Sequence, residues 1–163
     1  MNFFIKLFVL VFITVSNLNA EVKIHNINEY KITQKKMILT EIIKGLNYPW
    51  GLTFIDDKNL VVTEKNGELI KINIISKKIT KIKHQIKSIR FNGSGQGGLL
   101  DVLYNNGYLY FTYSHEFEST NDKKNYSTVI ARGKLVDDEI KNFEKLLVGR
   151  PKLSRNIHWG ARM

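Results

Sequence analysis

The feature that most constrains the fold is a series of short apolar runs in which side-chain character alternates every second residue. Four runs follow one another in the first half of the chain, and turn residues separate them: 52–55, 59–64, 68–73 and 78–83. Alternation places one face of a strand against a core, and the Asn66-Gly67 pair between two runs is a strong hairpin signal. The pattern predicts a four-stranded antiparallel meander.

The same pattern recurs further along the chain, in the runs 98–104, 108–114, 128–136 and 142–148. Asn106-Gly107 and Asp137-Asp138 supply turn residues between them. Two successive meanders of about fifty residues each are typical of the repeated blades of a β-propeller. We therefore expect an all-β fold without helices after residue 20, with about two blades and the start of a third.

A propeller protects its sheet edges only when a ring of roughly four to eight blades is closed. Two blades do not complete such a ring. A small β-sandwich or barrel built from the same strands is complete at this length. Periodicity alone leaves both architectures open.

The first twenty residues differ from the rest of the chain. Lys6 precedes an apolar run, 7–15, and Ala20 offers a small residue for cleavage. This arrangement is typical of a secretory signal peptide, and the run is short against the ~20 residues that a membrane-spanning helix needs. We expect a signal peptide over 1–20, a mature chain over 21–163, a periplasmic or secreted location, and no membrane attachment after cleavage.

The formal net charge is +10, and the chain contains no cysteine. The lysines are scattered through turns and alternating segments, without the aromatic-interleaved basic stripe of a nucleic-acid interface. We therefore expect a lysine-rich solvated surface and no nucleic-acid partner. The lack of cysteine excludes both lipoprotein attachment and disulfides.

Two segments carry candidate functional residues. The His158 imidazole near the end of the chain is able to accept a proton at neutral pH, and the small Gly160-Ala161 pair allows a flat ligand to approach the backbone. Gln96 lies in a glycine-rich loop, 93–98, from which an amide side chain can protrude. A structural histidine and an exposed turn glutamine are the alternatives that the residues leave open.

The glycine-rich loop also invites a phosphate-binding interpretation. A phosphate loop is followed by a helix and carries a Lys-Ser/Thr pair, whereas here the apolar run 99–103 follows directly. This excludes a nucleotide site. The histidines 25, 84 and 115 share no metal-ligand spacing, and the chain contains no carboxylate cluster suited to Ca²⁺.

Several longer motifs follow one another between about residues 39 and 163. They are LNYPWGL (46–52), VTE (62–64), GEL (67–69), GQGGLLDV (95–102), YFTYS (110–114), PKLS (151–154) and HWGARM (158–163). In order and spacing they resemble the soluble aldose sugar dehydrogenases, dependent on pyrroloquinoline quinone (PQQ), of the glucose/sorbosone dehydrogenase family. The last motif is similar to the family's His-x-Gly-Gly-Arg-Leu, with Ala161 in place of a glycine.

The resemblance implies a six-bladed propeller with its active site over the central channel, and a parent protein about twice as long, of which this chain is the N-terminal portion. It implies oxidation of an aldose to a lactone at the anomeric carbon, with hydride transfer to PQQ beside a bound Ca²⁺. His158 then takes the role of base, and Gln96 contacts the PQQ and sugar region. The family's calcium ligands lie beyond the point that matches Met163.

Some assignments stay open even with the resemblance. The roles of Arg162 and Asp101 are undecided. The Arg162 guanidinium is able to bind a carboxylate of PQQ, and Asp101 is explained equally well by a hydrogen bond in the core of a blade or by a catalytic role. The motifs do not specify the aldose or the electron acceptor. The alternative function is a catalytically inactive exported propeller remnant or a β-rich binding protein.

Overall fold

The computed structural model describes residues 30–32, 35–37, 40–118, 124–154, 159–160 and 162–163. The chain divides into two units, 1–40 and 41–163. In the first, β1 (Tyr30–Ile32) and β2 (Lys35–Met37) form an antiparallel hairpin that the sequence analysis did not predict. The expected signal peptide lies outside the described residues.

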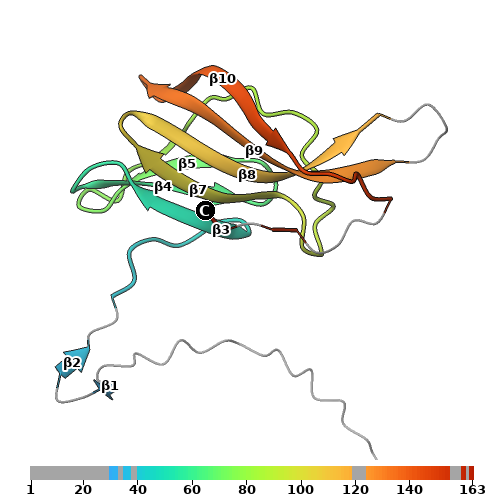
Figure 1. The fold of residues 1–163 in the computed structure, drawn as a ribbon. Coiled ribbons are helices and arrows are strands. Elements are labelled where there is room, and N and C mark those ends of the chain that lie inside the picture. The colour runs from blue at the N-terminus through green and yellow to red at the C-terminus, as the bar shows by residue number, and fades with distance from the viewer. Residues whose placement is uncertain (1–29, 33–34, 38–39, 119–123, 155–158, 161) are drawn as a thin grey trace, which may run out of the picture. The chain divides into compact units, whose positions relative to one another are not determined.

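The second unit contains two antiparallel four-stranded sheets (Figure 1). The first sheet has the order β3 (Pro49–Phe54), β4 (Asn59–Glu64), β5 (Leu69–Asn73) and β6 (Ile79–Lys81). The second has the order β7 (Leu99–Asn105), β8 (Tyr108–Phe117), β9 (Asn125–Val136) and β10 (Glu139–Val148). Each sheet is a sequential meander, which is the connectivity of a propeller blade rather than the Greek key of most sandwiches.

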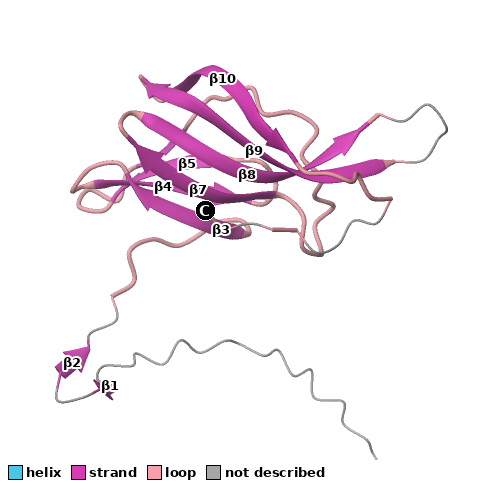
Figure 2. Ribbon diagram, viewed as in Figure 1, coloured by secondary structure: helices cyan, strands magenta, loops and turns pink. Residues whose placement is uncertain are grey.

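The prediction of an all-β fold is confirmed for the described residues, in which Figure 2 shows strands and loops but no helix. Within these same residues no helix has the length and apolar character needed to cross a membrane. The expected strand 142–148 begins three residues earlier, at Glu139. A register shift after Lys141 interrupts the alternation there, and Asn142 has a positive φ of 51°, so the pattern hides the start of this strand.

The main core lies between the two sheets. Along β8, Leu109, Phe111 and Tyr113 are fully buried, whereas Tyr108 before them and Tyr110 between the first two remain partly exposed. These buried side chains pack with Val61 of β4 and with residues of β5, β7, β9 and β10 in one cluster. Since burying a large apolar side chain contributes about 1.5–3 kcal/mol, this cluster fixes how the two sheets pack.

The other face of the first sheet is only partly covered. Residues of β4 and β5 on this face form a second cluster, against which Ile43 and Leu46 pack. At the edge strand β3, Trp50, Leu52 and Phe54 are 52, 62 and 54% exposed. Alternation places Leu52 and Phe54 on the same face of β3, whereas a register shift between Pro49 and Leu52 interrupts the alternation beside Trp50.

Candidate functional site

The glycine-rich loop lies directly before β7 and has the backbone that its composition predicts. Gly95 has a φ of 78° and Gly98 a φ of 138°, in the region that favours glycine. A Cβ on Gly98 would stand 2.6 Å from the Lys65 carbonyl oxygen, so this end of the loop packs directly on the end of β4. Gln96 lies between the two glycines and is exposed, as expected for a protruding amide.

Lys65 is a site residue that the sequence analysis missed. Its side chain is buried beneath the loop, and its ammonium group donates a hydrogen bond to the Gly95 carbonyl. Nζ also lies 5.0 Å from the ring centroids of both Trp50 and Phe91. The one sequence signal was its position, because Lys65 stands immediately after a predicted strand and between the family motifs VTE (62–64) and GEL (67–69).

Ser114 of β8 fastens the other end of the loop. Its hydroxyl accepts a 2.6 Å hydrogen bond from the Gly98 amide and donates a 2.8 Å hydrogen bond to the Arg90 carbonyl. Gly97 is tightly packed, and no larger residue fits at this position without a shift. A Cβ on Gly97 would lie 2.4 Å from the Arg90 carbonyl oxygen and 3.3 Å from Nε1 of Trp159. Trp159 belongs to the closing segment of the chain, residues 158–163. This segment therefore lies against the glycine-rich loop 93–98, here called the Gln96 loop, through Trp159.

The closing segment is also tied to β7. The Met163 amide donates a hydrogen bond to Asp101, whose own amide donates to Oγ1 of Thr112. Arg162 is exposed, and Gly160 has open space where a Cβ would project. His158 and Ala161 lie outside the described residues, so the structure brings the Gln96 loop beside this segment without testing the predicted base.

Trp159 is partly buried, and its ring meets that of Tyr126 edge-on at a centroid distance of 6.4 Å. Its buried Nε1 has no hydrogen-bond partner in the described part of the chain. Trp50 differs, since more than half of its surface is exposed beside the Lys65 ammonium. An exposed aromatic face, a cation and the Gln96 amide together suit a flat ligand that carries anionic groups.

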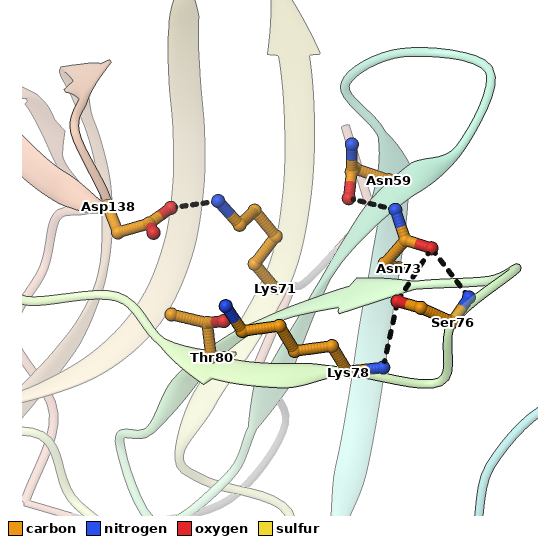
Figure 3. A pocket seen from close by; sticks show the side chains of 7 residues that line it. All are labelled: Asn59, Lys71, Asn73, Ser76, Lys78, Thr80 and Asp138. Carbon is orange, nitrogen blue, oxygen red and sulfur yellow. Dashed lines mark hydrogen bonds and ion pairs between the residues drawn. The ribbon is translucent and has the colours of Figure 1, made fainter.

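The described residues contain no group of three or more His, Cys, Asp or Glu side chains placed to hold a metal ion. A hollow of about 160 Å³ lies elsewhere, where β4, β5 and β6 meet the β9–β10 turn (Figure 3). Lys71 and Asp138 form an ion pair across this hollow, and Lys78 lines it. The Asp138 contact ties the second sheet to the first.

Comparisons with known proteins agree with these features. A family model described as Glucose / Sorbosone dehydrogenase matches residues 46–163. A crystal structure of a glucose dehydrogenase is 27% identical, with a TM-score of 0.64 over 76% of this chain and 36% of that one. The crystal structure of the soluble aldose sugar dehydrogenase from Escherichia coli in the apo-form is 29% identical, with a TM-score of 0.60 over 72% of this chain and 34% of that one.

An uncharacterized protein from Synechocystis sp. is 27% identical over 140 residues, which are 80% of this chain and 33% of that protein. The chain thus spans about a third of the length of these relatives. The family match covers more than half of the chain and includes both the Gln96 loop and the closing segment. The chain therefore belongs to the glucose/sorbosone dehydrogenase family.

Proposed function

We propose that the protein to which this chain contributes is an exported PQQ-dependent sugar dehydrogenase, which oxidises the anomeric carbon of an aldose to a lactone. The observation that carries the proposal is the contact between the Gln96 loop and the closing segment, within a continuous family match over residues 46–163. The two sequential meanders act as neighbouring blades of a six-bladed propeller in this proposal.

The residues present fit a flat anionic cofactor. Trp50 offers an exposed ring, Lys65 a positive charge beside it, and Gly160 a backbone with open space above it. Bound PQQ supplies an acceptor for the hydride that leaves the sugar. The chain's own part is to hold the sugar near the Gln96 amide, while His158 accepts the proton of the anomeric hydroxyl.

The calcium ion that the family implies has no ligand cluster among the described residues. We therefore assign no residue of this chain to calcium and place its ligands outside the described part. The second candidate, a catalytically inactive exported remnant, is favoured by Ala161, whose methyl group stands where the family motif has a glycine. DNA sequence beyond the Met163 codon separates the two: an open frame with further blades supports the enzyme, and a stop codon supports the remnant.

The direct test uses protein purified from the complete reading frame, with added PQQ, Ca²⁺, an aldose and a reducible dye. We expect sugar-dependent dye reduction, and a loss of roughly 10²–10⁴-fold in kcat for His158→Gln, because general-base catalysis contributes that much. His84→Gln is the matched control, since the Nε2 atom of His84 contacts the Gly67 carbonyl, away from the proposed site. Absence of dye reduction in the loaded wild-type protein contradicts the proposal.

A further inference from the structure

We propose that Lys65 is a positioning residue, which holds the Gly95–Gln96 peptide in place and thereby directs the Gln96 side chain. The inference rests on the proposed function, because Gln96 is the residue that the site uses. Its structural part is testable without cofactor or substrate.

The main chain of Lys65 is fixed on both sides. Its amide donates a 3.0 Å hydrogen bond to the Tyr48 carbonyl, and its own carbonyl accepts a 3.1 Å hydrogen bond from the Leu99 amide. Gly98 packs against its backbone and Cβ so closely that an added Cβ would lie 2.6–2.8 Å from them. The side chain therefore starts from a rigid base between the two sheets.

Lys65 is a buried residue, with 8% of its surface exposed. No carboxylate in the described part of the chain pairs with its ammonium group, which instead donates to the Gly95 carbonyl between the rings of Trp50 and Phe91. Burying a cation is costly unless hydrogen bonds and aromatic faces compensate. The Tyr48 ring meets Phe91 edge-on at 5.2 Å and closes this cage of aromatic side chains.

Two glycines of the loop beyond the cage, Gly93 and Gly95, have open space on one side. An added Cβ at Gly93 or Gly95 would find no atom within 4 Å, so neither glycine packs against the protein on that side. The Ser114 hydroxyl accepts a hydrogen bond from the Gly98 amide at the end of the loop and donates one to the Arg90 carbonyl before it. The Lys65 ammonium thus holds the loop at the peptide before Gln96, where glycine otherwise permits many backbone conformations.

The test is ¹⁵N relaxation on the full 163-residue chain, comparing the order parameters of Gly95 and Gln96 in variants at Lys65. Lys65→Met removes the ammonium while keeping an apolar stem, and we expect the order parameters to fall from about 0.85 to below about 0.6. Lys65→Arg keeps a cation and donors, so we expect it to restore most of the rigidity. Lys65→Gln serves the same purpose if the methionine variant does not fold.

Lys71→Met is the matched control, because it removes a partly buried ammonium that pairs with Asp138 and not with the loop. Unchanged loop order in Lys65→Met, or an equal loss in Lys71→Met, overturns the proposal. In the loaded full-length enzyme, Lys65→Met should lower kcat about tenfold, with recovery in Lys65→Arg, as a lost charge-assisted hydrogen bond predicts. A wild-type enzyme without turnover contradicts the proposed function instead, while the order parameters still decide the role of Lys65.

Discussion

The backbone amide of Met163 donates a 2.8 Å hydrogen bond to Oδ2 of Asp101, across 62 residues of sequence. Asp101 is itself fixed on β7 by the hydrogen bond from its amide to Thr112. The sequence left Asp101 open between a structural and a catalytic role, and this contact gives it a structural partner. This hydrogen bond therefore holds the end of the closing segment against β7, the strand that follows the Gln96 loop.

Removing the Asp101 carboxylate should loosen the closing segment. We expect Asp101→Ala to speed amide hydrogen exchange at Met163 severalfold, since a single hydrogen bond of this kind is worth about 1 kcal/mol. Asp101→Asn keeps an oxygen acceptor and should retain most of the protection. Equal exchange in the wild type and the alanine variant would show that the contact contributes nothing in solution.

The Thr63 hydroxyl joins the two sheets near the site. It accepts a 2.9 Å hydrogen bond from the Gly51 amide, which lies in a bulge of β3, and donates to the Leu100 carbonyl of β7. Thr63→Val keeps the shape but leaves both buried groups unpaired, so we expect a loss of about 1–3 kcal/mol in the free energy of unfolding.

Urea denaturation measures this loss, with Thr63→Ser as the control. The serine keeps the hydroxyl and gives up one methyl group, which costs about 1 kcal/mol at a buried position. A valine variant no less stable than the serine variant would argue against the hydroxyl bridge.

Two glycines of the site should respond differently to the same added methyl group. A Cβ at Gly97 meets the Arg90 carbonyl at 2.4 Å, whereas a Cβ at Gly160 meets nothing within 4 Å. We expect Gly97→Ala to lower the free energy of unfolding by about 1–3 kcal/mol, as overpacking does. Gly160→Ala should stay within about 0.5 kcal/mol of the wild type. Comparable losses for both, measured by urea denaturation, would contradict the close packing at Gly97.

Much of the fold follows from the alternation of apolar and polar residues and from the turn residues between the runs. The predicted run 59–64 has the same bounds as β4, and the predicted turns have positive φ at Asn106, Gly107, Asp137 and Asp138. Where the local pattern failed, long-range geometry was the cause. The register against β9 shifts after Lys141, and this shift breaks the alternation that the prediction of a strand start at residue 142 relied on.

The site was less predictable than the fold, because its contacts join distant segments. Gln96 is exposed on the predicted loop, yet nothing local indicated that Lys65 would reach the Gly95 carbonyl thirty residues away. A lysine after a strand is ordinarily solvated, and only the packing of the two sheets buries this one. The role of His158 stays a prediction, since that residue lies outside the described part.

His115 makes the stability of the second sheet sensitive to pH. His115 is buried on β8, and the centroids of its ring and the Phe117 ring are 4.3 Å apart. Its Nε2 atom lies 3.4 Å from Nζ of Lys145. Burial, and next the positive charge of Lys145, lower the pKa of His115 below its usual 6.5. Because an ammonium group only donates, Nε2 accepts this hydrogen bond and the ring is neutral.

The folded state therefore binds a proton at His115 less readily than the unfolded chain does. Its contribution to stability is complete above pH 6.5 and is lost as the pH falls from there through the lower folded-state pKa. We expect the urea midpoint to fall more between pH 7.5 and 5.0 in the wild type than in His115→Phe, which keeps an aromatic ring without a titrating group. Lys145→Met should raise the pKa of His115, as followed by NMR titration of its ring. A wild-type titration midpoint at or above 6.5 would contradict this account.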